Sequence, residues 1–276
     1  MKNIALGQYY AGDSVVHRFD ARTKVILALV YIVCTFVCKN VFSFLALFLS
    51  AAVLVIISKI PVKIILKALK PIIIIMLFTV VINVFWTSGE KLLFSWRFIN
   101  IYLEGIYNAL FMAIRIIVLI TGTSLFLTYT TTPIQLTDAI ERLLHPLKKI
   151  KVPVHEFAMM MTIALRFVPT LMDETERIMS AQKARGADFS SGSLLKRAKA
   201  LIPILVPLFV SSFRRADELA TAMECRCYHG GDGRTRMKIT HMKVSDVISF
   251  FVMAVFFAAL LAINFFAKKY GIGYTM

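Results

Sequence analysis

Runs of apolar residues, broken by only a few polar positions, recur along most of the chain. Four such runs lie before Thr132, and a fifth lies near the end of the chain. A helix that crosses a bilayer needs about 20 predominantly apolar residues, and these runs reach or approach that length once flanking residues are included. The pattern therefore predicts about five transmembrane helices, at 25–38, 41–58, 71–86, 105–128 and 244–267.

The segment between the second and third runs has a different periodicity. Four lysines spaced by four, four and three residues fall on one face of a helix, with isoleucine and leucine opposite. They are Lys59, Lys63, Lys67 and Lys70. This pattern indicates an amphipathic helix in the cytoplasmic membrane interface. The segment 87–104 is expected to be an external loop, with Trp96 and Tyr102 at the interface.

The fourth run carries a charge near its middle, Arg115. An ionisable side chain at that depth faces protein or water rather than lipid. Two roles stay open for this intramembrane polar residue. It is either a packing device, paired with an acid or a backbone carbonyl, or part of a functional site.

The stretch 132–243 shows signals of long helices outside the membrane. Thr132 and Pro133 predict a helix start, Pro153 opens a second helix that runs to about Ala184, and a third runs from about Leu194 to Glu224. The apolar runs inside these helices are too short or too interrupted to span. A spanning hairpin would also carry many bases to the outer face.

These patterns predict an all-α polytopic membrane protein in three parts. They are an N-terminal membrane domain at 1–131, a cytoplasmic domain of long amphipathic helices at 132–243, and a C-terminal transmembrane helix at 244–276. The prolines inside the long helices are expected to bend them.

Composition and charge agree with a membrane protein. Hydrophobic residues make up 58% of the 276 residues, against roughly 45–50% in soluble domains. The formal net charge is +16, which in a soluble chain would indicate nucleic acid. Here most of the bases lie beside apolar spans, so we expect no nucleic-acid partner. The positive-inside preference instead orients the chain, with the N-terminus and 132–243 in the cytoplasm of a cell-membrane protein.

Candidate chemistry for an enzyme is weak. Asp173, Glu174 and Glu176, with His145 or His155, are candidate catalytic groups, but a solvated helix face explains the acids better. The four cysteines, Cys34, Cys38, Cys225 and Cys227, lack the spacing of a zinc site. We expect no metal site and no catalytic residue. The chain also lacks a glycine-rich phosphate loop followed by lysine and Ser/Thr, so it is not expected to bind ATP.

Two arginines stand at or near the ends of the long helices, each between small residues. The first lies in Ala184-Arg185-Gly186 and the second in Cys225-Arg226-Cys227. An arginine complements the dipole of a helix C-terminus, and a following glycine ends the helix without steric cost. One copy would indicate an ordinary cap, whereas two copies suggest a pair that contacts one kind of partner surface.

These motifs resemble those of the T component of energy-coupling factor transporters, the transmembrane coupling protein of a family of vitamin importers. The resemblance covers nearly the whole chain. It includes His17 to Lys24, with Ala21 where proline is usual, and Ala164 to Leu171. The Arg185 motif matches fully, whereas the Arg226 motif keeps only the arginine.

The resemblance implies a non-catalytic subunit of an ATP-driven importer of vitamins or micronutrients. Two ABC-type ATPase subunits would use ATP and magnesium, small membrane S components would capture the substrate, and this chain would couple the two without binding a cofactor. The ATPase-binding residues implied are Ala184, Arg185, Gly186, Cys225, Arg226 and Cys227. The S-component-binding residues implied are Phe157, Met160, Met161, Leu165, Phe167, Leu171, Leu201, Leu205, Leu208 and Phe209. The alternative is a self-sufficient membrane carrier or channel, for which Arg115 is the main intramembrane candidate.

Overall fold

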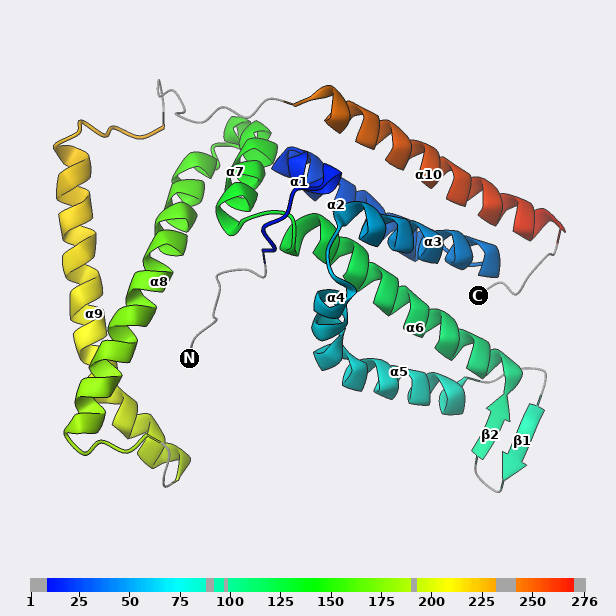
Figure 1. Cartoon of the computed structure of the whole chain (residues 1–276), viewed down its shortest axis with the longest axis horizontal. Coiled ribbons are helices and arrows are strands. Elements are labelled where there is room, and N and C mark those ends of the chain that lie inside the picture. The colour runs from blue at the N-terminus through cyan, green and yellow to red at the C-terminus, as the bar shows by residue number, and fades with distance from the viewer. Residues whose placement is uncertain (1–8, 88–91, 97–98, 190–192, 232–241, 271–276) are drawn as a thin grey trace. The chain divides into compact units, whose positions relative to one another are not determined.

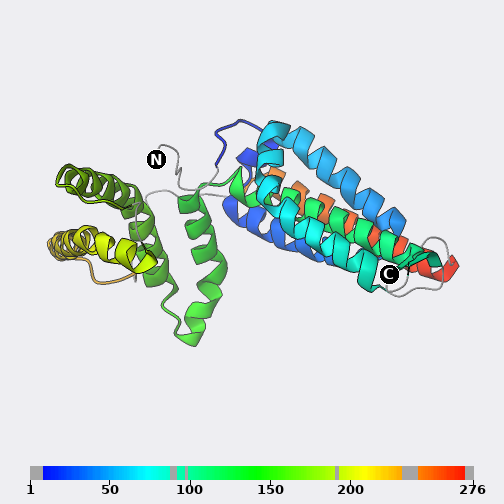
Figure 2. The ribbon, with the colours of Figure 1, turned by 90° about the horizontal axis from the view of Figure 1, so that it is seen from below.

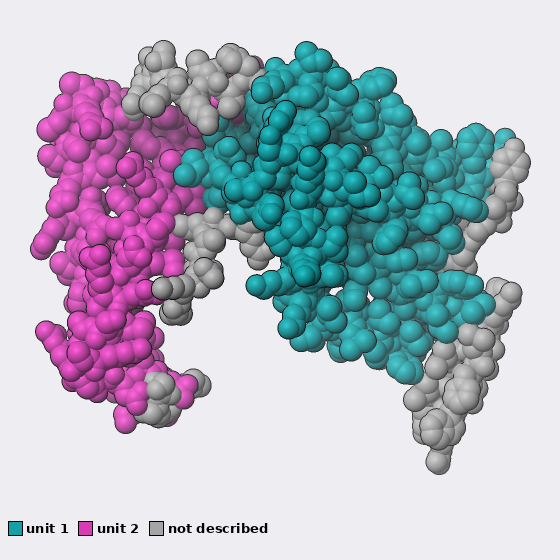
Figure 3. Space-filling model, in the orientation of Figure 1, with its two compact units in different colours: residues 1–139, 239–276 teal, residues 140–238 magenta. Residues whose placement is uncertain are grey.

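The computed structural model describes residues 9–87, 92–96, 99–189, 193–231 and 242–270 (Figure 1). The chain divides into two compact units, residues 1–139 with 239–276, and residues 140–238 (Figure 3). Most of the described residues are helical, as the apolar periodicity predicts.

Unit 1 holds the transmembrane-type helices. Its elements are α1 (Val15–Arg18), α2 (Ala21–Val37), α3 (Val41–Ser58), α4 (Val62–Leu69), the 3₁₀ turn η1 (Lys70–Ile72), α5 (Ile73–Trp86), β1 (Leu92–Trp96), β2 (Ile99–Tyr102), α6 (Leu103–Thr123), the π-helical turn η2 (Ser124–Thr128) and α10 (Val244–Tyr270). Helices α2, α3, α5, α6 and α10 run alongside one another as a bundle (Figures 1 and 2).

Helix α2 is largely enclosed by its neighbours in this bundle. It packs against α6 and α10, and its side chains Leu27, Tyr31 and Cys34 are buried in the core of the unit. Gly122 of α6 permits a close approach, because a Cβ atom at that position would overlap the ring of Tyr31. The helix with the shortest apolar run is thus the one most enclosed by protein.

Four helical segments are long and apolar enough to cross a membrane. They are Val41–Ser58, Val62–Trp86, Leu103–Thr128 and Val244–Ala267. They overlap four of the five predicted spans, and Val62–Trp86 also includes most of the segment predicted as an interfacial amphipathic helix. The remaining predicted span, 25–38, falls on α2, which has 17 residues and begins among charged residues. Its enclosure by protein explains why it needs less apolar length than a lipid-facing helix.

The predicted amphipathic helix and the third span form one bent segment. Helix α4 passes into α5 through η1, where Pro71 occupies the first turn, and Figure 1 shows the change of direction. Ile65 is buried, whereas Lys63 and Lys67 are exposed. The two faces of α4 therefore separate as the lysine spacing predicts.

The predicted external loop contains an unpredicted hairpin. Strands β1 and β2 pair antiparallel, with Leu92 opposite Tyr102 and Trp96 opposite Ile99. Tyr102 is half-buried, and the side chain of Trp96 lies outside the described part. A short hairpin does not change the all-α class, but it gives this connection a defined backbone.

Unit 2 is built on two long helices. Helix α7 (Pro133–Leu144) leads from unit 1 into it through the 3₁₀ segment η3 (His145–Ile150), followed by α8 (Val154–Ala184) and α9 (Leu194–Glu224). Helices α8 and α9 contact each other and cross (Figure 1). Pro169 lies inside α8, and Pro203 and Pro207 lie inside α9. Helix α9 is bent in Figure 1. Proline favours such a bend because it has no backbone N–H to donate within the helix.

The helix ends in this part follow their local signals. Thr132 and Gln135 cap α7 reciprocally, because the Thr132 hydroxyl accepts from the Gln135 amide and the Gln135 side chain accepts from the Thr132 amide. Ser193 caps α9 through a hydrogen bond from the Lys196 amide. The predicted ends of α8 and α9 at Ala184 and Glu224 agree with the structure.

Candidate functional site

The end of α8 is a complete Schellman cap. Gly186 adopts a left-handed conformation with φ +85°. Its amide donates to the Lys183 carbonyl at 3.0 Å, and the Ala187 amide donates to the Gln182 carbonyl at 3.0 Å. These are the two backbone bonds that define the motif. Arg185 is the last residue before the left-handed position.

The end of α9 repeats this geometry without a glycine. Cys227 takes the left-handed position with φ +52°. Its amide donates to the Glu224 carbonyl at 2.8 Å, and the Tyr228 amide donates to the Met223 carbonyl at 3.1 Å. Arg226 is again the residue before the left-handed position. The Arg226 motif, which matches the family pattern only at its arginine, therefore still forms the same backbone cap.

All six residues of the two motifs are exposed. The two caps lie at opposite ends of the α8–α9 pair (Figure 1). Among the residues that the structure describes, neither the Arg185 side chain nor the Arg226 side chain donates a hydrogen bond to another residue. Each guanidinium stands at the negative end of a helix dipole, with its donors open to a partner.

The apolar faces of α8 and α9 are also largely open. Six of the residues assigned to partner binding are exposed, and these are Phe157, Met160, Met161, Leu201, Leu205 and Phe209. Four are half-buried, and these are Leu165, Phe167, Leu171 and Leu208. The buried hydrophobic residues among those described in unit 2 are Val154, Ala158 and Ile204. The helix pair thus leaves most of its apolar side chains without cover inside its own unit.

An ion pair joins α8 to α9. The Arg215 guanidinium donates to the Glu174 carboxylate at 2.6 Å, and both side chains are partly exposed. Glu174 is one of the acids considered above as catalytic chemistry, and the structure places it in this structural role. His155 is likewise engaged, because its Nδ1 lies 3.0 Å from a Glu141 carboxylate oxygen.

No cluster of three potential metal ligands occurs among the described residues. Cys225 and Cys227 are exposed free thiols, whereas Cys34 and Cys38 are buried free thiols in unit 1. Asp173 and Glu176 lie exposed on α8. The described side chains therefore bring no catalytic or metal-binding constellation together in unit 2.

Arg115 is held inside unit 1 by backbone and aromatic contacts. Its guanidinium donates to the Cys38 carbonyl at 3.1 Å and lies 5.2 Å from the centre of the Phe44 ring. The Cys38 carbonyl belongs to the turn between α2 and α3. Of the two roles left open by the sequence, the structure supports the packing device paired with a carbonyl.

A polar cluster at one end of unit 1 was not foreseen. The buried ammonium of Lys24 donates to the Thr130 carbonyl at 2.7 Å and to the His17 carbonyl at 3.2 Å. Buried Asp246 accepts from the Asp20 amide at 2.9 Å. In the sequence, Lys24 and the other charges just before the first span are typical of a membrane-interface anchor. The signal that could have placed Lys24 inside is its helical spacing from Leu27 and Tyr31.

Comparison with known proteins bears on this architecture. The family model described as cobalt transport protein matches residues 12–239. A protein of Clostridium kluyveri named energy-coupling factor transporter transmembrane protein EcfT is 55% identical over 250 residues, which cover 90% of this chain and 92% of the relative. The protein of the same name from Bacillus subtilis is 46% identical over 257 residues, covering 92% of this chain and 97% of the relative. The chain therefore belongs to the cobalt transport protein family, among the transmembrane proteins of energy-coupling factor transporters.

Proposed function

We propose that the chain is the coupling subunit of an ATP-driven importer. In this role it transmits the motion of two ATPase subunits to a separate membrane subunit that captures the substrate. The observation that carries the proposal is the pair of matching caps, which presents Arg185 and Arg226 in the same backbone setting on two long helices. Two equivalent cationic ends are suited to two equivalent partner surfaces.

Arg185 and Arg226 dock the two ATPases. A guanidinium offers a planar fork of donors for a carboxylate or for helix-end carbonyls in a groove. The neighbouring Ala184 and Gly186 at one end, and Cys225 and Cys227 at the other, are small enough for a close approach. ATP and magnesium belong to the ATPases in this scheme, and the coupling subunit binds no cofactor.

The apolar faces of α8 and α9 bind the capture subunit. Exposed apolar patches of this extent mark protein or membrane contacts, and the ten residues named above supply such a surface. The capture subunit selects the vitamin or micronutrient, so the coupling subunit can serve more than one substrate. The protein is a multi-pass protein of the cell membrane, with its N-terminus and residues 132–243 in the cytoplasm.

Co-purification of the epitope-tagged chain from its native membrane in mild detergent tests the proposal. We expect two nucleotide-binding ATPases and one or more small hydrophobic proteins to accompany the wild-type chain. Arg185→Glu and Arg226→Glu should each weaken ATPase recovery, and the double variant should abolish both recovery and uptake. The matched controls are Arg177→Glu and Arg214→Glu, which reverse an exposed charge on the same two helices.

Normal ATPase recovery by an inserted double variant would contradict the docking role. The alternative, a self-sufficient carrier or channel, predicts substrate flux through the chain alone in vesicles. No observation of the described side chains favours it, because Arg115, the intramembrane candidate, is engaged with the Cys38 carbonyl and Phe44.

A further inference from the structure

An apolar groove of about 700 Å³ runs between α3 and α10 in unit 1. Leu49 and Val53 of α3 form one wall, Ile248 and Val252 of α10 form the other, and Tyr31 of α2 lies in the lining. The four wall residues are all exposed, whereas Tyr31 is buried. The groove is therefore open toward the surroundings and closed at its base.

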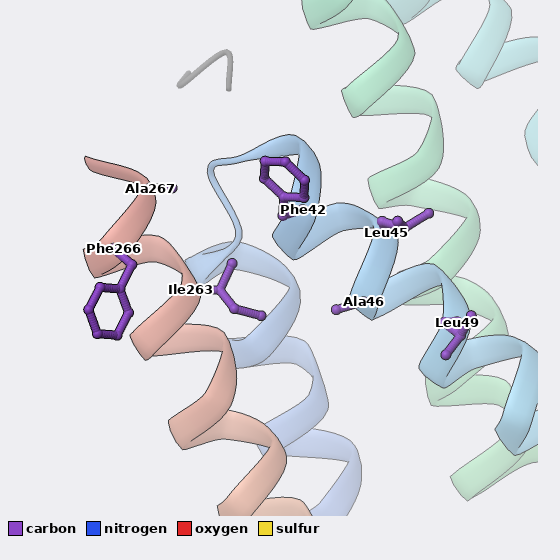
Figure 4. Close-up of a pocket in the computed structure, with 7 residues that line it drawn as sticks. All are labelled: Phe42, Leu45, Ala46, Leu49, Ile263, Phe266 and Ala267. Carbon is purple, nitrogen blue, oxygen red and sulfur yellow. The ribbon is translucent and has the colours of Figure 1, made fainter. Parts of the chain in front are cut away.

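The groove continues along the same two helices. A second pocket of about 590 Å³ shares Ala46 and Leu49 with the first and extends to Phe266 and Ala267 of α10. Figure 4 shows its lining side chains on α3 and α10. Both helices are long and apolar enough to cross a bilayer. Where these two helices cross a membrane, the groove between them lies at the depth of the hydrocarbon layer.

Three elements place a basic residue at the same end of the first pocket. Arg18 adjoins the lining residue Phe19, Lys59 lies two residues after the lining residue Ile57, and Lys243 lies two residues before the lining residue Ser245. All three bases are exposed. An apolar groove that ends at exposed cations is complementary to a phospholipid with an anionic headgroup. The acyl chain would lie along the groove, and the headgroup would lie beside the cations.

Asp13 cancels part of this charge but not all of it. Arg18 forms a two-bonded ion pair with the Asp13 carboxylate at 2.7–2.8 Å. The hydrogen bond and charge of Arg18 lower the pKa of Asp13, so that this pair stays formed and neutral at neutral pH. The charge of Lys59 also lowers the pKa of Asp13, to a smaller extent. Lys59 and Lys243 remain as the bases that give this end its net positive charge.

We propose that this groove binds one acyl chain of an anionic phospholipid, with Lys59 and Lys243 contacting its phosphate-bearing headgroup. A transmembrane helix of a partner fits the space less well. Helix α1, through Val15 and Val16, and the adjacent Phe19 also line the basic end. A flexible acyl chain can enter such a groove from the side.

Native mass spectrometry of the full chain with added lipid tests the proposal. The probes are phosphatidylglycerol and phosphatidylcholine with identical acyl chains, so that they differ in headgroup charge alone. We expect the wild-type chain to retain one tightly bound phosphatidylglycerol. Lys59→Gln with Lys243→Gln should weaken this binding on the order of tenfold and remove most of the preference over phosphatidylcholine, because each base near an anionic headgroup adds to its affinity.

The control for charge is Lys67→Gln with Lys70→Gln, which removes two exposed lysines from another part of unit 1. This pair should leave the preference unchanged. Equal loss in both double variants, or no loss in either, would overturn the headgroup assignment. Neither pair lies in the core, so both variants are expected to fold.

Filling the groove tests the acyl-chain position. Ala46→Trp should remove the retained lipid, whereas Ala52→Trp should keep it, because Ala52 is exposed on the same helix and lines neither pocket. Retention of the lipid by folded Ala46→Trp would overturn the proposal. A photo-crosslinking amino acid at Val53 supplies an independent measurement in cells. It should label lipid, and crosslinks to a protein partner would show that a helix occupies the groove instead.

Discussion

Arg185 and Arg226 occupy the same position in two matching helix caps, each immediately before a residue with positive φ. In the first cap that residue is Gly186, and in the second it is Cys227. The two backbone hydrogen bonds that close each cap are also the same. The cap geometry is therefore retained where the sequence replaces glycine by cysteine, and the arginine keeps its setting.

The first prediction concerns the strain at Cys227. A non-glycine residue in the left-handed region costs about 1 kcal/mol, so Cys227→Gly should stabilise the last turn of α9. Hydrogen–deuterium exchange should slow about fivefold at the Cys227 and Tyr228 amides, which close the cap. Gly186→Ala is the mirrored control and should speed exchange at the end of α8. Unchanged exchange in both variants would show that the residue in the left-handed position does not affect the opening of either cap.

The second prediction concerns the ion pair at the α8–α9 contact. Because Glu174 and Arg215 are partly exposed, their pairing should contribute about 1 kcal/mol. Glu174→Arg and Arg215→Glu should each lower the thermal stability of the purified chain, and the double charge swap should recover part of the loss. Asp173→Arg, at an exposed neighbouring position, should have little effect. Strictly additive losses would exclude a direct interaction.

The third prediction concerns the close approach of α6 to α2. A Cβ atom at Gly122 would overlap the Tyr31 ring, so Gly122→Ala should destabilise unit 1 by about 1–3 kcal/mol through overpacking. Tyr31→Leu removes the ring and should make the Gly122→Ala change much less costly in the same background. Thermal unfolding in detergent measures all three variants. If Gly122→Ala costs the same in both backgrounds, the overlap with Tyr31 is not its cause.

The fourth prediction separates the two roles considered for Arg115. Arg115→Met removes the donor to the Cys38 carbonyl and the contact with Phe44, which should cost about 2 kcal/mol of stability. Uptake by cells should fall only as far as the amount of folded protein falls. Arg115→Lys keeps the charge but lacks the planar guanidinium, so its stability should lie between those of the wild-type chain and Arg115→Met. A more than tenfold loss of uptake by a well-folded Arg115→Met variant would instead indicate a functional site.

Local signals predicted the long helices well, because helix ends are decided by neighbouring residues. Gly186, two residues after Ala184, marks the end of α8, and Ser193 precedes α9 with a capping hydroxyl. The end of α8 and the start of α9 could therefore be predicted from the sequence. The positions of Arg185 and Arg226 at the ends of α8 and α9 follow for the same reason, whereas their role in partner binding stays a prediction.

Features that depend on distant segments could not be predicted in this way. Lys24 bonds to the Thr130 carbonyl across 106 positions of sequence, and a lysine beside a span is otherwise typical of the membrane surface. The antiparallel pair β1–β2 depends on hydrogen bonds between two strands and not on local helix signals. The groove exists only because α3 and α10, which are far apart in the sequence, lie side by side in unit 1, and its walls look in sequence like any lipid-facing surface.

The sparse burial in unit 2 has a consequence for the life of the protein in the cell. A newly made copy without partners displays Phe157, Phe209 and the other exposed side chains of α8 and α9, which are the kind of surface that chaperones and quality-control proteases recognise. Assembly would hide these side chains and protect the copy. The steady-state amount of the chain should then follow the supply of its partners rather than its own rate of synthesis.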